Sequence, residues 1–187
     1  MTSSAVQKVS FRGATFYVKR DDLFVAPLHT PQGLPEGLKG NKGRKLHYYL
    51  SVDLPEVSRI VSYGSAQSNM LYSLSCLAAM RGWQLDFYVD HIASSLLNNP
   101  HGNYAAALAN GARIHAVGDR ADQISLGDYA EALAADDQAS LFIPEGGRSA
   151  IAEQGVKQLA EEINSWVMEN NIPNPKLMLP SGTGTSA

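Results

Sequence analysis

Three short segments of the sequence carry residue types that could bind a ligand or perform chemistry. The first, residues 40–46 (GNKGRKL), places Lys42, Arg44 and Lys45 within four residues at the start of a predicted helix. The helix macrodipole disfavours a cation at that end, and neighbouring like charges favour the neutral amine. A neutral lysine amine is the nucleophile that forms Schiff bases with aldehydes and ketones. The competing interpretation is a solvated basic turn, which short basic runs commonly form.

The second segment, residues 62–69 (SYGSAQSN), lies between a predicted strand and a predicted helix. Backbone N–H groups at such a helix start attract an anion, and the side chains of Ser68 and Asn69 add hydrogen bonds. Ligands of open α/β sheets bind at the carboxyl ends of the strands, where this turn is expected. The alternative is simple capping of the helix by Ser68 or Asn69.

The third segment, residues 181–186 (SGTGTS), is a glycine loop that follows a predicted strand. Glycines let consecutive N–H groups converge on a phosphate, and hydroxyl groups supply further donors. Gly182, Gly184 and Ala187 also fit the Gly-x-Gly-x-x-Ala dinucleotide fingerprint, which is weak evidence alone. A flexible tail is the remaining alternative. The candidate phosphate ligands are Ser181, Gly182, Thr183, Gly184 and Thr185.

Alternating strands and helices are expected to position these segments. Strict alternation implies right-handed βαβ crossovers, and therefore an α/β fold with a parallel sheet and helices on both faces. An N-terminal β-hairpin is predicted from residues 9–11 and 15–18, and Asn41 is expected to cap a helix over residues 42–51. The other predicted strands are 59–63, 84–90, 113–117, 140–143 and 176–179, and the predicted helices are 67–81, 101–110, 122–135 and 150–169.

Composition and charge exclude several classes of function. The 187 residues carry a net charge of −3, from 15 basic and 18 acidic residues, which gives no electrostatic reason to expect nucleic acid or a membrane surface as partner. Cys76 is the only cysteine, so no internal disulfide can form, and the histidines show no metal-ligand spacing. No run approaches the roughly 18 apolar residues of a membrane span, so we expect a cytoplasmic protein. Because metal-ligand spacing is absent, we expect no metal.

Taken together, the three segments resemble the fold-type II pyridoxal-phosphate enzymes, most closely the branch of 1-aminocyclopropane-1-carboxylate deaminase and D-cysteine desulfhydrase. Residues 40–46 resemble the motif of the cofactor lysine, which implies that Lys42 forms the Schiff base. Gln67, Ser68 and Asn69 resemble the substrate turn. The resemblance implies that Ser68 contacts the substrate carboxylate and takes part in proton transfer. It also implies that Asn69 hydrogen-bonds the cofactor ring oxygen, and that the terminal glycine loop binds the phosphate.

The resemblance covers nearly the whole chain, although some positions depart from the family pattern. Residues 19–23 and 143–147 are also similar to the family. Lys39 stands where a glycine is usual, Ser65 replaces a glycine in the substrate turn, and Met70 stands where histidine is common. The last two changes lie beside the expected substrate and leave the reaction open.

The resemblance implies a tryptophan synthase β-like fold in which residues 54–170 form a small domain. Residues 1–53 and 171–187 would belong to a large cofactor domain that is incomplete at residue 187, so we expect this chain alone to be inactive. The resemblance implies that the full-length form catalyses pyridoxal-phosphate-dependent deamination or β-elimination of a small amino acid, giving a 2-oxo acid and ammonia. It also implies that the full-length form is a homodimer. Two alternatives stay open: a Rossmann-type nucleotide-binding protein that uses the terminal loop, and an inactive truncated paralogue.

Overall fold

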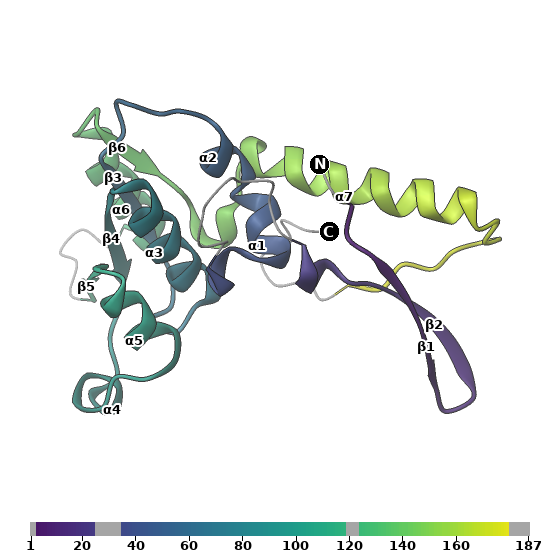
Figure 1. Cartoon of the computed structure of the whole chain (residues 1–187). Coiled ribbons are helices and arrows are strands. Elements are labelled where there is room, and N and C mark those ends of the chain that lie inside the picture. The colour runs from purple at the N-terminus through teal and green to yellow at the C-terminus, as the bar shows by residue number, and fades with distance from the viewer. Residues whose placement is uncertain (1–2, 25–34, 119–123, 180–187) are drawn as a thin grey trace. The chain divides into compact units, whose positions relative to one another are not determined.

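The chain divides into two compact units, each with its own packing. The computed structural model describes residues 3–24, 35–118 and 124–179. The first unit combines Met1–Ser51 with Ala150–Ala187, and the second consists of Val52–Ser149. Figure 1 shows the elements of both units.

The second unit is built on a four-stranded parallel sheet. Its strands are β3 (Arg59–Tyr63), β4 (Gln84–Val89), β5 (Arg113–Ala116) and β6 (Ser140–Phe142). They pair in the order β5-β4-β3-β6, and every pair is parallel. The strands predicted for this part of the sequence are confirmed, with ends that differ by at most one residue. Parallel pairing requires a crossover after each strand, which is why the chain alternates between strands and helices here.

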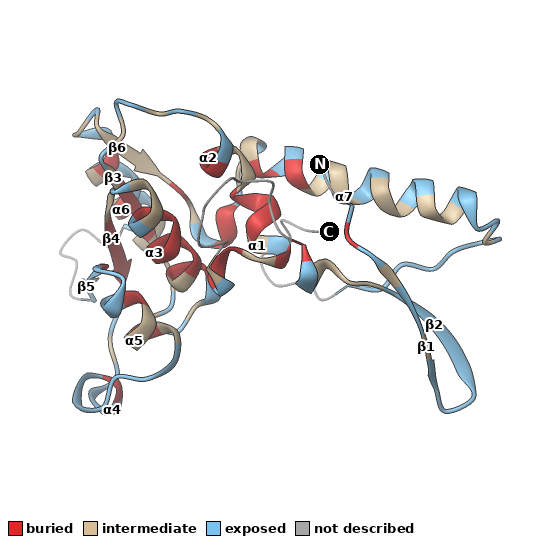
Figure 2. Cartoon of the chain, in the orientation of Figure 1, coloured by how far each residue is buried: buried red, intermediate tan, exposed pale blue. Residues whose placement is uncertain are grey.

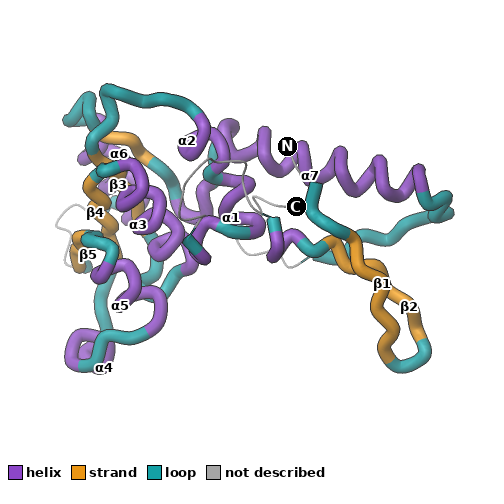
Figure 3. The backbone as a smooth tube through the Cα atoms, in the orientation of Figure 1, coloured by secondary structure: helices purple, strands orange, loops and turns teal. Residues whose placement is uncertain are grey.

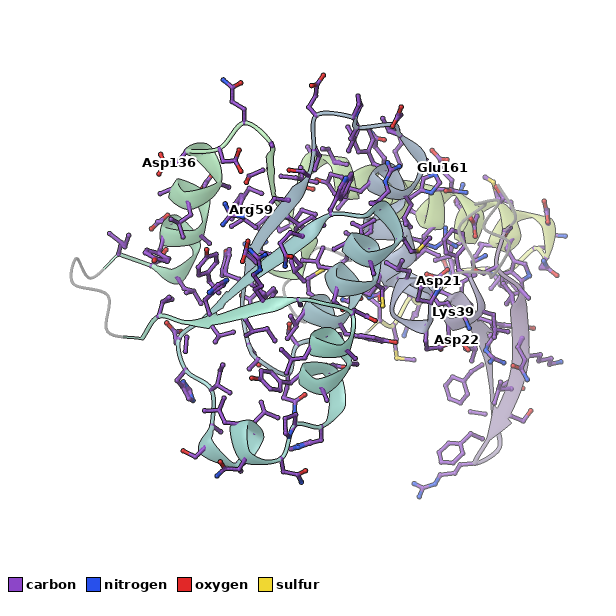
Figure 4. All side chains as sticks on the ribbon, turned by 60° about the vertical axis from the view of Figure 1, so that its left-hand side comes forward. Asp21, Asp22, Lys39, Arg59, Asp136 and Glu161 are labelled. Carbon is purple, nitrogen blue, oxygen red and sulfur yellow. The ribbon has the colours of Figure 1, made fainter. Side chains whose placement is uncertain are left out.

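Helices cover both faces of this sheet, as the sequence predicts. The helices of the unit are α3 (Asn69–Arg81), α4 (Ser94–Asn98), α5 (Gly102–Ala109), α6 (Leu126–Ala135) and the single-turn helix η3 (Glu145–Gly147). Helices α3 and α5 lie on one side of the strands and α6 lies on the other, which Figure 4 shows edge-on. The α/β fold class inferred from the sequence is therefore confirmed.

The alternation of side chains along the strands supplies a core on each face. Val61 and Tyr88 are buried against Ala130 of α6. Because neighbouring strand residues point to opposite faces, the buried Ile60 and Phe87 point toward α3 instead. Burying a side chain of this size stabilises the fold by about 1.5–3 kcal/mol, so these two layers hold the sheet and its helices together.

Local signals fix both ends of α3. The Oγ atom of Ser68 accepts a hydrogen bond from the backbone N–H of Leu71, at 3.0 Å, and so caps the first turn. Gly82 ends the helix in the left-handed conformation, with φ of 69°, which glycine adopts without strain. Most of α3 between these caps is buried (Figure 2). The sequence-predicted helix start at residue 67 thus lies two residues too early.

The first unit begins with the predicted β-hairpin, which is confirmed. Strands β1 (Val6–Phe11) and β2 (Ala14–Lys19) pair antiparallel around a two-residue turn (Figure 3). Arg12 and Gly13 both have positive φ, at 49° and 78°, which matches the twist that a two-residue hairpin turn requires. Most side chains of the hairpin are exposed.

The remaining elements of the first unit are helices in its described residues. Helix α7 (Ala150–Glu169) has the bounds predicted from the sequence. The predicted helix over 42–51 is instead two short helices, α1 (Gly40–Lys45) and α2 (His47–Ser51), which meet at Leu46. Asn41 therefore caps nothing, because the residue before α1 is Lys39. The unit also contains two single-turn helices, η1 (Asp21–Leu23) and η2 (Glu36–Leu38).

Packing groups α7 with the first unit. The sequence interpretation placed residues 54–170 in the small domain, but the second unit ends at Ser149. Gly155 of α7 packs so closely on the backbone of Arg44 that a Cβ would have no room there. Glu162 of α7 also forms an ion pair with Arg44. The second unit begins at Val52.

The segment at the end of the described chain also differs from prediction. Residues 176–179 were expected to form a strand, but they adopt no regular structure and are exposed. A strand needs a partner for its backbone groups, and none of the described strands pairs with this segment. The predicted phosphate loop, Ser181 to Thr185, lies outside the described residues. None of the helices in the described ranges has the length and apolar character that a membrane crossing requires.

Candidate functional site

Helix α1 carries Lys42 and is fixed in place by glycines. Gly40 has φ of 61°, and its backbone N–H bonds to the carbonyl of Phe24 at 3.2 Å. Gly43 lies against the backbone of Leu38 with no space for a Cβ. A larger residue at either glycine would displace the turn. These contacts explain why the segment around Lys42 is rich in glycine.

Arg44 anchors the same helix to its neighbours in the first unit. Its side chain is only 1% exposed, and its Nε atom donates to Asp21 Oδ1 at 2.7 Å. Its Nη1 and Nη2 atoms bond both carboxylate oxygens of Glu162, at 3.0 and 2.9 Å. Its guanidinium carbon also lies 4.0 Å from the centre of the Phe24 ring. One of the three cations in the basic segment is therefore structural, and it holds α1 on α7.

The carboxylate of Glu162 is shared by two cations, Arg44 and Lys19. Burial raises its pKa, but hydrogen bonds and charge from Arg44 and Lys19 outweigh that effect and lower the pKa to about 2. Lys19 lies 2.7 Å from the same carboxylate. Glu162 therefore stays ionised at neutral pH and satisfies the buried guanidinium.

Lys42 and Lys45 have different surroundings from Arg44. Lys42 is half-buried and forms no ion pair with another described residue, and burial lowers its pKa. Lys45 is only 4% exposed, and burial together with the charge of Lys42 lowers its pKa to about 8. The basic segment is thus not the solvated turn that the alternative interpretation required.

Of the two reasons that the sequence gave for a neutral amine, the helix dipole was wrong, while the effect of neighbouring like charges holds for Lys45. Helix α1 has six residues, and Lys42, Arg44 and Lys45 all lie in its last turn. A cation is stabilised by the helix dipole at that end. Desolvation of the side chains, which the sequence pattern did not reveal, is what lowers the pKa of Lys42.

In the second unit, the turn before α3 brings together the residues of the predicted substrate turn. Ser68 caps α3, so the capping alternative is confirmed for it, while its hydroxyl hydrogen remains available to donate. The backbone N–H of Ser68 bonds to the carbonyl of Ser65 at 3.0 Å. Gly64 has φ of 145°, in the region that favours glycine, where the chain turns out of β3.

The side chain of Gln67 is held by the start of α5. Its Oε1 atom accepts from the backbone N–H of Tyr104 at 3.3 Å, and its Nε2 atom donates to the carbonyl of His101 at 3.3 Å. Gly102, with φ of 57°, lies directly under this amide, and a Cβ there would come within 3.0 Å of Oε1. Gln67 therefore connects the turn before α3 to the start of α5.

Asn103 is a residue of this site that sequence reasoning missed. Its Nδ2 atom lies 3.0 Å from the backbone oxygen of Gln67 and 2.9 Å from Oδ1 of Asn69. The only signal for it in the sequence is a Gly-Asn pair at a helix start, which also occurs in ordinary turns.

A second polar cluster that the sequence did not indicate lies on the α6 face of the sheet. Asp86, 3% exposed, accepts from Arg59 Nε at 2.7 Å and pairs with His115 Nε2 at 2.6 Å. The His115 ring stacks on Tyr88, with ring centres 4.9 Å apart. The only sequence signal was a lone carboxylate in the apolar run of β4. The cluster joins three neighbouring strands through one buried carboxylate.

The predicted site residues therefore fall in both units. The second unit brings Gln67, Ser68 and Asn69 together, while Lys42 belongs to the first unit. Within the described ranges, no group of histidine, cysteine or carboxylate side chains could hold a metal ion. Ser181, Gly182, Thr183, Gly184 and Thr185 lie outside those ranges.

Comparisons with known proteins identify the fold. No protein-family model matches the sequence, and a search of curated proteins gives no match. Among solved structures, an ACC deaminase homologue matches with a TM-score of 0.67 and 23% identity, over 100% of this chain and 54% of that chain. A threonine deaminase from T.th. matches with a TM-score of 0.46 and 16% identity, over 69% of this chain and 37% of that one.

The conclusion about the fold rests on the first of these matches. At its level of identity it shows a shared fold, which is the α/β fold with a parallel sheet flanked by helices. The chain spans about half the length of that solved structure.

Proposed function

We propose that this chain is part of a pyridoxal-phosphate-dependent deaminase or lyase that acts on a small amino acid. The proposal rests on the environment of Lys42. This lysine is half-buried, it forms no ion pair with another described residue, and burial lowers its pKa. Such an amine is a nucleophile toward an aldehyde. The fold shared with an ACC deaminase homologue supports the proposal.

The residues of each unit fit this cofactor in their chemistry. Lys42 offers the amine for covalent attachment. Asn69 offers an Nδ2 group that donates to no other described residue, which suits the ring oxygen. Phosphate binding by Ser181, Gly182, Thr183, Gly184 and Thr185 follows from the resemblance alone. When bound, pyridoxal phosphate withdraws electrons from the substrate carbon next to the amine.

The remaining chemistry belongs to the side chains. Ser68 can donate its hydroxyl hydrogen to the substrate carboxylate while its oxygen still caps α3. Lys42, once released from the cofactor, can take and return a proton, because burial favours its neutral form. With one water consumed, the proposed products are a 2-oxo acid and ammonia from a substrate of the 1-aminocyclopropane-1-carboxylate type, and hydrogen sulfide in addition from one of the D-cysteine type. We further propose that the full-length form is a homodimer.

The test is an absorbance titration of the purified chain with pyridoxal phosphate, followed by borohydride. Wild type and the Lys45→Ala variant should develop a visible band that borohydride bleaches, and Lys42→Ala should not. Because this chain is expected to bind the cofactor weakly, the titration should reach millimolar cofactor. A band that survives in Lys42→Ala but disappears in Lys45→Ala would contradict the assignment. Binding of a nicotinamide nucleotide without any such band would favour the nucleotide-binding alternative.

A further inference from the structure

A single carboxamide joins the two turns at one end of the parallel sheet. The Nδ2 atom of Asn103 lies 3.0 Å from the backbone oxygen of Gln67 and 2.9 Å from Oδ1 of Asn69. The two contacts use both hydrogens of that amide nitrogen. Asn103 thus links the start of α5 to the start of α3.

The backbone contact determines how both carboxamides are oriented. A backbone carbonyl can only accept a hydrogen bond, so the Asn103 atom that faces Gln67 must be its nitrogen. The same nitrogen faces Asn69, so the Asn69 atom that it contacts must be an acceptor, namely Oδ1. The Nδ2 group of Asn69 is consequently turned away from Asn103. It makes no hydrogen bond to another residue in the described part of the chain.

The position of Asn103 is itself fixed by its neighbours. Gln67 is bound at both ends of its amide, by Tyr104 and His101. Gly102 leaves the space that this amide occupies. The two turns therefore form one hydrogen-bonded assembly, and Asn103 cannot rotate without breaking its bond to the Gln67 carbonyl.

We propose that Asn103 is a positioning residue that holds the Asn69 carboxamide with its Nδ2 hydrogens outward. A ligand group that meets Asn69 must then be a hydrogen-bond acceptor, such as an anionic oxygen. This role of Asn103 deepens the proposed function. That the acceptor is the cofactor ring oxygen rests on the proposed function. Asn103 itself touches neither cofactor nor substrate in this proposal.

The first arm of the test needs no cofactor and uses side-chain amide resonances of the full 187-residue chain by NMR. Asn69→Asp replaces the acceptor with a charged one, so the Asn103 side-chain protons should shift downfield and exchange more slowly. Asn69→Ala should make one of these two protons exchange faster. Unchanged Asn103 resonances in both variants would overturn the proposal.

The second arm measures the affinity of each variant for pyridoxal phosphate. Asn103→Asp keeps the shape of the side chain but can only accept, so Asn69 must turn its nitrogen inward to meet it. We expect the dissociation constant to rise by about tenfold or more, as in Asn69→Ala. Because Asn103 acts through Asn69, the change should have little further effect in an Asn69→Ala background. An equally large effect in that background would show a general structural role and overturn the proposal.

A matched control lies at the other end of the same helix. Asn110 donates through its Nδ2 atom to Ser75 Oγ at 3.0 Å, and it makes no contact with Asn69. Asn110→Asp should leave the affinity for pyridoxal phosphate within about twofold. If the wild-type chain never binds pyridoxal phosphate, the proposed function fails, while the NMR arm still decides the role of Asn103.

Discussion

Lys42 and Lys45 lie three residues apart on one short helix, and burial lowers the pKa of both amines. Lys42 is the more exposed of the two and can meet a ligand aldehyde, whereas Lys45 is almost fully covered. The exposure of the two lysines therefore distinguishes them better than their position on the helix does. This difference gives a physical reason to assign the covalent link to Lys42.

Burial of Lys45 should make the stability of the protein depend on alkaline pH. Its pKa is about 8 in the folded chain and 10.5 when unperturbed, so the unfolded chain binds more protons between these values. The free energy of unfolding should therefore rise with pH across that window. Lys45→Met removes the buried charge and should therefore remove most of this dependence of stability on pH.

Urea unfolding at pH 7, 8, 9 and 10 measures this effect. The Lys45→Met profile should be flatter than the wild-type profile above pH 8. Lys39→Met is the control, since Lys39 is more exposed and forms a surface pair with Glu36, worth about 1 kcal/mol or less. If the free energy of unfolding of Lys45→Met rose with pH as steeply as that of wild type, Lys45 would not be the buried charge.

Ser68 combines a structural hydrogen bond with a proposed role toward substrate, and two substitutions separate them. Ser68→Ala removes the cap on α3 and should cost about 1 kcal/mol of stability. Ser68→Asn retains a capping acceptor and should cost little. In an active form of the proposed enzyme, both should lose turnover while keeping the cofactor. Thermal unfolding and steady-state kinetics measure the two effects. Retained turnover in Ser68→Asn would show that Ser68 only caps α3 and has no role toward substrate.

At the scale of elements, the junction of α1 with α7 depends on a buried guanidinium. Glu162→Gln leaves Arg44 with less compensating charge and should destabilise the protein by about 3 kcal/mol. The pKa of Glu162 is about 2, below its ordinary value of 4.5. Its contribution is therefore complete above pH 4.5 and is lost as the pH falls toward 2.

Denaturant unfolding between pH 7 and pH 3 checks this prediction. The difference between wild type and Glu162→Gln should shrink as the solution is acidified. Glu161→Gln provides the matched control, because Glu161 is the exposed neighbour on the same helix (Figure 4). Equal losses in the two variants would refute the role of the buried pair.

The sequence predicted elements well where periodicity determines them. The strands of the second unit and α7 follow from alternating and helical patterns of apolar residues. The break at Leu46 and the absence of a strand at 176–179 depend on packing between distant segments, which no local pattern contains.

The same limit applies to the candidate site. Lys42, Ser68 and Asn69 were found because their residue types suit the chemistry. The contact of Asn103 with Asn69 required the placement of α5 beside α3. The pair of Asp86 and His115 required the register of β4 with β5, which sequence periodicity does not fix.

At the scale of the whole chain, the two units differ in how completely they cover their strands. Strands β3 and β4 are hydrogen-bonded on both sides and carry buried side chains. Most side chains of the hairpin of β1 and β2 are exposed, with Phe11 61% exposed. Isolated two-stranded hairpins are marginally stable in water. The second unit should therefore be the more stable part of this chain.

Amide hydrogen exchange tests that order. Amides of β3 and β4 should exchange most slowly, near the rate set by global unfolding. Amides of β1 and β2 should exchange at least about 100-fold faster, because they open locally without exposing a core. The helix α7 offers an internal comparison within the first unit. Slower exchange in the hairpin than in β3 would contradict the assignment of the stable core.

The covalent partner of Lys42 is the central claim, and peptide mapping tests it most directly. The purified chain is incubated with excess pyridoxal phosphate at pH 8, reduced with borohydride, digested and analysed by mass spectrometry. The reduced adduct should concentrate on Lys42 and exceed labelling of the exposed Lys8 and Lys176, because burial keeps more of the Lys42 amine neutral. An adduct found mainly on Lys45, or spread evenly over the exposed lysines, would contradict the account.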